Sequence, residues 1–267
     1  MFFYHFLPQP ILIKIGPINI YWYGILAFLA FWLGFFLVLR LIKYTNFPRE
    51  KIIDLMFWLF VFSLIGARLF HVFSNFYYYR KQPVEILFFW QGGLGIFGAM
   101  IIGMIFLYFY SRKYHLDFWR LLDLFSPSLA LGIVIIRWGN YFNQELYGLP
   151  TDSFFRIPIS PENRLPGFEN FNFFQPVFFY ESIFCFFVFV FLILRFKKSH
   201  PGSIFSYFLI FYSTFRFLIE FLRIDPQPII FGLRLGQIMS LLGLIFYFLL
   251  LTKKFRARRD LNPRSPA

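Results

Sequence analysis

The side chains best suited to chemistry are a few charged residues inside otherwise apolar segments. Tyr212, Arg216 and Glu220 follow one another at intervals of four residues. A helix would place all three on one face, so that Glu220 holds Arg216 and the Tyr212 hydroxyl lies beside it. Arg137 and Asn140, three residues apart, would also share a face. Because guanidinium groups match phosphate oxygens in bidentate geometry, this pattern favours binding of a phosphate-bearing ligand.

Other chemistries lack the residues they need. The sequence has no closely spaced His, Cys, Asp or Glu set typical of zinc sites and no Gly-rich loop with lysine for a phosphate. A paired-aspartate motif of a magnesium-dependent lipid transferase is also missing. We therefore expect no metal and no cofactor.

The composition indicates a membrane protein. Of the 267 residues, 59% are apolar and 15% are charged, whereas average soluble domains have about 45–50% and about 25%. The net charge of +13 could suggest nucleic acid, but the basic residues lie between apolar segments rather than on a polar domain. We therefore expect no nucleic-acid partner.

Apolar runs of about 20 residues can cross the hydrocarbon core of a bilayer, and the chain contains seven candidates. They are residues 15–39, 52–77, 86–111, 121–136, 176–194, 201–222 and 235–252. The predicted fold is an all-α polytopic membrane protein in which residues 1–267 form a single integral membrane domain. The polar stretch 137–175, between the fourth and fifth spans, is predicted to be one extracytoplasmic subdomain.

The basic residues predict the orientation in the membrane. Most of the 26 Lys and Arg residues lie in the first, third and fifth connections and in the C-terminal tail, so these segments should face the cytoplasm. Seven spans then place the N-terminus, the 137–175 segment and the 223–234 connection outside.

With this topology, five charged residues converge in the outer half of the bilayer. They are Arg68, Arg137, Glu181, Arg216 and Glu220. An ionisable group in a span costs at least about 2.5–3.5 kcal/mol on insertion scales and marks a candidate functional site. Three arginines against two glutamates predict a positively charged cavity suited to an anion. The alternatives are structural ion pairs within the bundle, or a transporter or channel for small anions; charges on one side favour a lipid-accessible enzyme site.

The segment from Arg137 to Gly148, RWGNYFNQELYG, resembles the signature of bacterial prolipoprotein diacylglyceryl transferases. Further blocks similar to that family follow its order along nearly the whole chain. They are Tyr21 to Gly24, Gly66 to Arg68, Trp90 to Gly93, Gln175 to Glu181, Arg216 to Arg223, and Gly236 with Gln237. The resemblance also implies seven spans with the N-terminus outside.

The resemblance implies a reaction between two membrane-associated substrates. The diacylglyceryl group of phosphatidylglycerol passes to the lipobox cysteine thiol of a prolipoprotein signal peptide. A thioether forms and glycerol phosphate is released, which is the first step of bacterial lipoprotein maturation. The implied location is the bacterial cytoplasmic (inner) membrane, in which the protein is embedded by several passes.

The resemblance further implies which residues form the site. Arg137 and Arg216 would stabilise the phosphate and the thiolate, Glu220 would orient Arg216, and Tyr212 and Glu145 complete the expected catalytic set. Asn140 would position the headgroup, and Gly148 would permit close backbone approach. The expected substrate-binding residues are Tyr23, Arg68, His71, Asn140, Asn143, Gly148, Tyr180, Glu181 and Arg223.

The chain departs from the family pattern at Phe97, where many members carry a histidine proposed as the general base. Phenylalanine cannot accept a proton, which leaves two hypotheses. His71 could act as a substitute base, or the arginine cavity could stabilise the thiolate while water takes the proton. We favour the cavity, since His71 is more simply explained as a partner of the Arg68 region.

Overall fold

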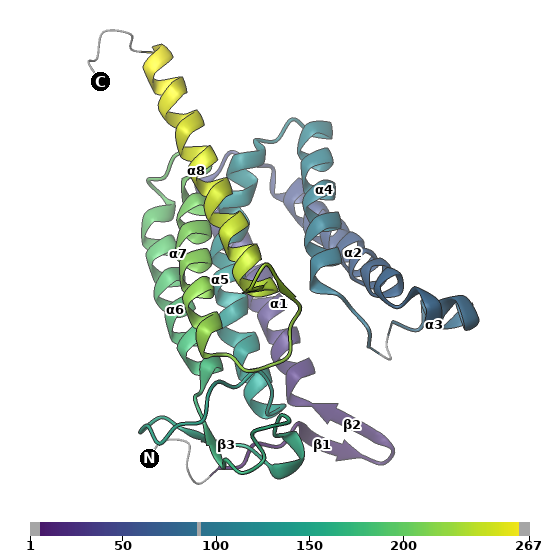
Figure 1. The fold of residues 1–267 in the computed structure, drawn as a ribbon. Coiled ribbons are helices and arrows are strands. Elements are labelled where there is room, and N and C mark those ends of the chain that lie inside the picture. Colours follow the sequence, from purple (N-terminus) through teal and green to yellow (C-terminus); the bar gives the residue numbers. More distant parts are fainter. Residues whose placement is uncertain (1–5, 90–91, 262–267) are drawn as a thin grey trace. The chain divides into compact units, whose positions relative to one another are not determined.

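The computed structural model describes residues 6–89 and 92–261. The chain divides into two compact units, Met1–Val38 together with Asp123–Ala267 (unit 1) and Leu39–Leu122 (unit 2). The eight α-helices of the described residues are α1 (Trp22–Leu41), α2 (Arg49–Ser74), α3 (Phe76–Lys81), α4 (Ile96–Lys113), α5 (Phe118–Phe142), α6 (Val177–Phe196), α7 (Ser203–Ile219) and α8 (Leu235–Leu261) (Figure 1).

Six of these helices are long and apolar enough to cross a membrane, as far as the described residues extend: α1, α2, α4, α5, α6 and α7. The apolar part of α8, Leu235–Leu250, is shorter. The prediction of a helical, polytopic membrane protein is therefore confirmed. The seventh span and the orientation stay predictions.

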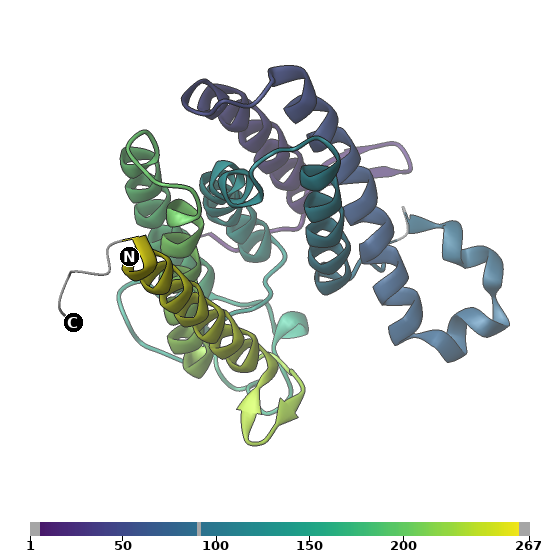
Figure 2. The same cartoon turned by 90° about the horizontal axis from the view of Figure 1, so that it is seen from above.

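In unit 1 the helices pack closely through small residues. The Ser128 hydroxyl of α5 donates a hydrogen bond to the Gly34 carbonyl of α1, with 3.1 Å between the oxygens. Ser182 of α6 donates to the Val134 carbonyl of α5 over 2.9 Å. Helix α7 contacts both α6 and α8, which lie side by side with it in the view from above (Figure 2). Small and hydroxyl-bearing side chains at such contacts are typical of helix packing in membranes.

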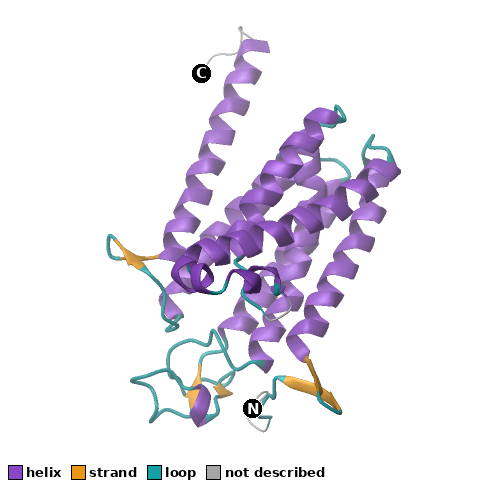
Figure 3. Cartoon of the chain, turned by 90° about the vertical axis from the view of Figure 1, so that its right-hand side faces the viewer, coloured by secondary structure: helices purple, strands orange, loops and turns teal. Residues whose placement is uncertain are grey.

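The strands of the described residues form three two-stranded antiparallel hairpins, all in unit 1. They pair β1 (Ile11–Ile15) with β2 (Ile18–Tyr21), β3 (Ile157–Pro158) with β4 (Phe173–Phe174), and β5 (Ile229–Ile230) with β6 (Leu233–Arg234). Their registers place Ile15 opposite Ile18, Ile157 opposite Phe174, and Ile230 opposite Leu233. The β1–β2 and β3–β4 hairpins lie at the end of unit 1 opposite the last turns of α8, and the β5–β6 hairpin lies beside the first turn of α8 (Figure 3).

The segment between α5 and α6 packs Tyr147, Ile157 and Phe174 into an apolar core that it shares with Tyr141 of α5 and Phe178 of α6. The buried side chain of Gln144 links this segment to the N-terminal part of the chain. Its side-chain amide donates to the Pro8 carbonyl over 2.7 Å, and its side-chain oxygen accepts the Ser160 backbone N–H over 2.6 Å. A compact folded segment is thus present where the sequence predicts a subdomain.

In unit 2, α2 packs against α4. Gly66 and Gly98 face each other at this contact, where a Cβ on either residue would collide with the backbone of the other helix. After α2 come α3 and a short 3-10 helix, Pro83–Leu87. The backbone N–H of Gly95 then donates to the Ala67 carbonyl over 2.9 Å, which holds the start of α4 against α2.

Several predicted span boundaries are wrong. The first span does not begin at residue 15, because a turn at Gly16, with a φ of +57°, folds residues 11–21 into a hairpin. The third does not begin at residue 86, because Gly92 and Gly93 have positive φ angles and α4 begins only at Ile96. The fourth runs beyond residue 136 to Phe142, so Arg137 and Asn140 lie on the helix rather than in the segment after it.

Candidate functional site

The candidate site is centred on Glu181, whose side chain is only 1% exposed. Helix α6 begins directly after Pro176, a residue that favours the first turn of a helix, and Glu181 follows in the second turn. One carboxylate oxygen accepts hydrogen bonds from Arg137 Nη2 at 2.7 Å and from the Tyr212 hydroxyl at 3.1 Å. Arg216 Nη1 lies 3.6 Å from the other oxygen. A buried carboxylate needs such partners, because an unpaired charge in this position is costly.

A second carboxylate, Glu220, is fully buried one turn beyond Arg216. Its Oε2 atom lies 2.9 Å from Arg216 Nη2, and its Oε1 atom accepts a 2.9 Å hydrogen bond from Arg234 Nε. Arg216 therefore bridges Glu181 and Glu220. It lies in the last turn of α7, where a cation interacts favourably with the helix dipole. The predicted face of Tyr212, Arg216 and Glu220 is confirmed.

A third carboxylate joins the site through an amide. Arg137 Nη1 donates to the Asn140 side-chain oxygen at 3.0 Å, and the Asn140 side-chain nitrogen donates to Glu145 at 2.9 Å. After α5 ends, Gln144 adopts a φ of +52° and the Glu145 N–H returns to the Asn140 carbonyl over 3.0 Å. This left-handed turn brings the Glu145 carboxylate back to the helix, where Asn143 also donates to it over 3.3 Å.

A further layer of charge lies in the connection from α7 to α8. Arg223 and Asp225 form a bidentate pair with distances of 2.7 and 2.9 Å, and Gln227 donates to Asp225 over 2.9 Å. Burial alone would raise the pKa of the Asp225 carboxyl. The hydrogen bonds and charge of Arg223, with help from Gln227 and Arg234, outweigh burial and hold that pKa below its usual range.

Two glycines make room for neighbouring parts of the site. A Cβ on Gly139 of α5 would lie 2.7 Å from the Tyr23 ring, so this glycine lets the ring pack on the helix. A Cβ on Gly148 would lie 2.8 Å from the Leu222 carbonyl oxygen, so the predicted close backbone approach at Gly148 is present. The backbone that approaches Gly148 is that of Leu222 in the same chain.

Within unit 1 the cluster is balanced in charge. Four arginines (Arg137, Arg216, Arg223 and Arg234) lie with four carboxylates (Glu145, Glu181, Glu220 and Asp225). The predicted excess of positive charge depends on Arg68, which belongs to unit 2, and stays a prediction. Two buried guanidinium nitrogens, Arg137 Nε and Arg216 Nη1, nevertheless have no hydrogen-bond acceptor within the described residues.

Arg68 and His71 belong to unit 2, so the predicted convergence of Arg68 with the other four charges stays a prediction. Arg68 bonds to backbone carbonyls of its own unit: Nε to Ile86 at 2.9 Å, Nη1 to Gly92 at 2.8 Å and to Gly93 at 3.1 Å, and Nη2 to Glu85. His71 lies close by, since a Cβ on Gly93 would come 2.6 Å from its Nε2 atom. Arg68 thus holds the segment before α4 in place. Trp90 and Gln91, which belong to the family-like block Trp90 to Gly93, lie outside the described residues.

The Tyr180 hydroxyl interacts with Ser153, and the predicted role of Tyr180 in substrate binding stays a prediction. Sequence reasoning missed Asp225 and Arg234 as members of the cluster. Gly236 lies in one of the family-like blocks, and a Cβ there would lie 2.6 Å from Glu220 Oε2. The signal that could have revealed them is a connection of twelve residues, from 223 to 234, that holds two arginines and an aspartate between two apolar helices.

Comparison with known proteins gives a consistent result. The family model described as prolipoprotein diacylglyceryl transferase matches residues 10–253. A phosphatidylglycerol–prolipoprotein diacylglyceryl transferase of Halalkalibacterium halodurans is 35% identical over 266 residues, which cover 96% of this chain and 91% of the relative. Proteins of the same name from Trichormus variabilis and Parasynechococcus marenigrum are each 38% identical and cover 89% and 87% of this chain, and 86% and 89% of the relatives.

Proposed function

Since the chain belongs to the prolipoprotein diacylglyceryl transferase family, we propose that the cluster around Glu181 and Glu220 is the catalytic centre of that activity. The protein is a multi-pass membrane transferase of lipoprotein biosynthesis, acting at the first step of lipoprotein maturation. The comparisons do not support the alternative of a small-anion transporter or channel.

The substrates are phosphatidylglycerol and a prolipoprotein whose lipobox cysteine receives the lipid. In the transfer, the thiolate sulfur forms a bond to the glycerol carbon that carries the phosphate ester. The bond between that carbon and the ester oxygen breaks, and glycerol phosphate leaves with the electron pair. Negative charge therefore moves from the sulfur to the leaving phosphate, and fixed cations beside both atoms lower the barrier.

The single observation that carries this proposal is a pair of buried guanidinium nitrogens, Arg137 Nε and Arg216 Nη1, which find no acceptor among the residues that the structure describes. An unsatisfied buried donor is costly, and a phosphate oxygen of the substrate would satisfy it. Both arginines are held by Glu181, so the ion pairs orient them while one nitrogen of each remains for the substrate. Asn140 and Glu145 extend the site on the Arg137 side, where they would contact the headgroup.

The remaining predicted residues have supporting parts in this proposal. Tyr23 is 37% exposed and lies within electrostatic range of Glu145 and Arg137, which suits contact with substrate. Tyr212 helps to fix Glu181, and the buried Arg223 pairs with Asp225. Phe97 cannot act as a base. The arginines therefore stabilise the cysteine thiolate, which can lower a thiol pKa from about 8.5 toward neutrality, and water takes the proton.

The proposed topology has seven spans in the bacterial inner membrane, with α8 as the seventh, the N-terminus outside and the C-terminus in the cytoplasm. Two observations support it. The folded segment between α5 and α6, which contains the β3–β4 hairpin, and the β1–β2 hairpin lie at the same end of unit 1. The opposite end of α8 carries the basic tail. Residues 137–175 are then the main extracytoplasmic part of a single membrane domain.

A direct assay tests the function. Purified protein is incubated with phosphatidylglycerol vesicles and a peptide containing a lipobox cysteine, and mass spectrometry follows the peptide. The peptide should gain the mass of one diacylglyceryl group, while a matched peptide with serine in place of cysteine should not change. An unmodified cysteine peptide, with folded protein and both substrates present, would contradict the proposed function.

A further inference from the structure

Arg234, at the end of β6, has all three side-chain nitrogens bonded to the site or to the connection that covers it. Nε donates to Glu220 Oε1 at 2.9 Å, Nη1 to the Arg223 carbonyl at 3.0 Å, and Nη2 to the Asp225 carbonyl at 2.7 Å. Its backbone N–H donates to the Gln237 side chain over 3.0 Å. The expected catalytic and substrate-binding set does not include this residue.

The bond to Glu220 occupies one oxygen of that carboxylate and leaves the other to Arg216 and, at 4.0 Å, to Arg223 Nη1. Oε1 is taken by Arg234, and Oε2 lies 2.9 Å from Arg216 Nη2. A carboxylate with both oxygens free would accept the two-pronged fork of one arginine, since the bidentate geometry is the stronger one. With Oε1 occupied, Arg216 is held by a single nitrogen. Its Nη1 atom keeps only a 3.6 Å ion-pair contact with Glu181.

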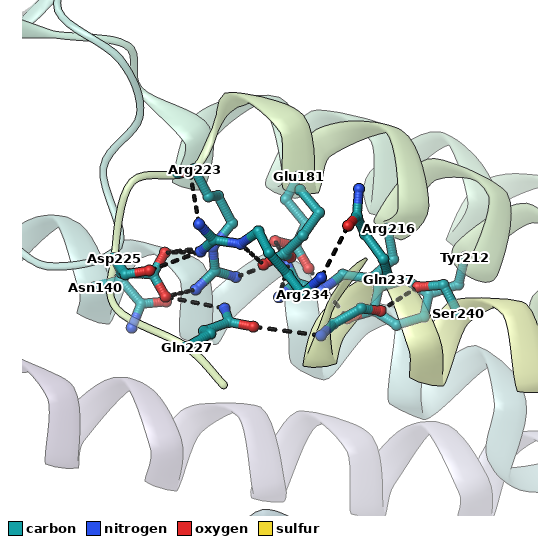
Figure 4. Close-up of polar contacts among 12 residues, drawn as sticks. Asn140, Glu181, Tyr212, Arg216, Arg223, Asp225, Gln227, Arg234, Gln237 and Ser240 are labelled. Atoms are coloured by element: carbon teal, nitrogen blue, oxygen red, sulfur yellow. Dashed lines mark hydrogen bonds and ion pairs between the residues drawn. The ribbon is translucent and has the colours of Figure 1, made fainter. Parts of the chain in front are cut away.

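The space around Glu220 prevents an easy rearrangement. The first turn of α8 closes over the carboxylate at Gly236, where a Cβ would lie 2.6 Å from Oε2. The Gly236 N–H donates to Gln227 over 3.3 Å, and Gln227 in turn donates to Asp225. Glu220 is therefore confined by the connection that carries Arg234, in which Asp225 contacts both Arg234 and Gln227 (Figure 4).

We propose that Arg234 is a positioning residue for the transfer reaction: by occupying one oxygen of Glu220, it keeps Arg216 singly bonded, so that Arg216 Nη1 stays available to the substrate phosphate. This inference rests on the proposed function of the cluster. Arg234 acts through Glu220 and Arg216, so its effect should fall on the step in which charge develops on phosphate rather than on lipid binding alone.

Kinetics of single variants provide the first test. In Arg234→Gln, Glu220 can take up both nitrogens of Arg216, so kcat for the lipobox peptide should fall at least about tenfold while KM for phosphatidylglycerol changes less than about threefold. Arg234→Lys, which keeps a cation for Glu220, should recover at least about a third of the wild-type kcat. An equal loss in kcat for the lysine and glutamine variants, both folded, would overturn the inference.

Gln227→Ala is the matched control, because it removes the hydrogen bonds of Gln227 with Asp225 and Gly236, which weakens the connection, without touching the Arg234–Glu220 bond. It should keep kcat within about threefold of the wild type. If it loses as much as Arg234→Gln, then Arg234 merely holds the connection closed and the inference is wrong.

A double variant provides a second test. In a Glu220→Gln background, adding Arg234→Gln should lower kcat by less than a further threefold or so, since the effects of residues acting through one contact are not additive. A further tenfold loss there would show that Arg234 acts independently of Glu220.

A structural readout separates this inference from the proposed function. A structure of Arg234→Gln in lipid nanodiscs should show both nitrogens of Arg216 within hydrogen-bond distance of Glu220. Arg216 that keeps a single bond to Glu220 would overturn the positioning role, whatever the activity. Conversely, a wild type that does not lipidate the peptide refutes the proposed function, and the Arg216 geometry still decides the role of Arg234.

Discussion

At the scale of the residue, the chemistry of the site depends on how each guanidinium divides its donors. Arg137 uses Nη2 for Glu181 and Nη1 for Asn140. Arg216 places Nη2 in an ion pair with Glu220. In the described part of the chain, Arg137 Nε and Arg216 Nη1 have no hydrogen-bond acceptor. A planar group can meet two protein partners and a substrate in fixed directions, which a point charge on a flexible stem cannot do.

Arg137→Lys should therefore lose most activity although it keeps the charge. One ammonium cannot contact Glu181, Asn140 and a phosphate in the same directions. Loss of one donor that stabilises a transition state typically costs about 10²–10³ in kcat. The measurement is the lipobox-peptide assay on protein shown to be inserted and folded.

Arg156→Lys is the control, because Arg156 pairs at 3.2 Å with Asp152, whose side chain is 98% exposed. The activity of this variant should stay near that of the wild type. Normal activity of Arg137→Lys would reduce Arg137 to an electrostatic or structural role.

His71→Phe distinguishes the two hypotheses for the thiol proton. His71 packs edge-on against Tyr79, with 5.9 Å between the ring centroids, and belongs to unit 2 with Arg68. If the arginines stabilise the thiolate, the variant should keep at least about a tenth of wild-type turnover near neutral pH, because losing a general base typically costs about 100-fold or more. A drop beyond 100-fold in folded protein, together with loss of a near-neutral inflection in the pH–rate profile, would make His71 the base.

At the scale of the element, the sequence predicts helices more securely than their ends. The apolar runs identify six of the membrane helices because each run must satisfy its backbone hydrogen bonds internally. The predicted third span begins too early because apolar residues continue through Ile86 and Leu87. Arg68, however, binds the backbone carbonyls of Ile86 and Gly92 and prevents a continuous helix there. Periodicity does give the face of Tyr212, Arg216 and Glu220. It cannot show that Asp225 and Arg234 fold back onto that face, since this depends on the path of an irregular connection.

Asp123 illustrates a charged residue that organises an element instead of the site. It is fully buried, and its two oxygens accept the N–H groups of Gly202 and Phe205, each over 2.8 Å, at the start of α7. Asp123→Asn replaces one acceptor by a donor that faces an N–H group. The variant should lose about 1–3 kcal/mol of unfolding free energy.

Thermal unfolding in detergent measures this effect. Asp117→Asn is the control, because Asp117 accepts the N–H groups of Trp119 and Arg120 from an exposed position, where asparagine caps a helix about as well as aspartate. Its midpoint should stay close to wild type. Equal midpoints for the Asp123 and Asp117 variants would show that the buried carboxylate adds nothing beyond an ordinary cap.

At the scale of the whole molecule, the proposed chemistry requires the cluster to face the side on which prolipoproteins emerge. Basic residues should remain cytoplasmic, and they concentrate in the tail and in the connection from α6 to α7. The Arg137–Glu181 and Arg216–Glu220 pairs lie near the other ends of α5, α6 and α7, beside the folded segment between α5 and α6. A lipid substrate can then reach the site from the outer leaflet.

Cysteine labelling tests this orientation in intact cells. Glu162 lies on the exposed surface of the segment between α5 and α6, and Lys198 is exposed after α6. In a background in which the buried Cys185 is replaced by serine, a membrane-impermeant maleimide should label Glu162→Cys in intact cells and Lys198→Cys only after lysis. A reporter fused after Ala267 should likewise be cytoplasmic. If both cysteines react alike in intact cells, or the reporter lies outside, the positive-inside assignment fails. The cluster would then face the wrong side for a secreted cysteine substrate.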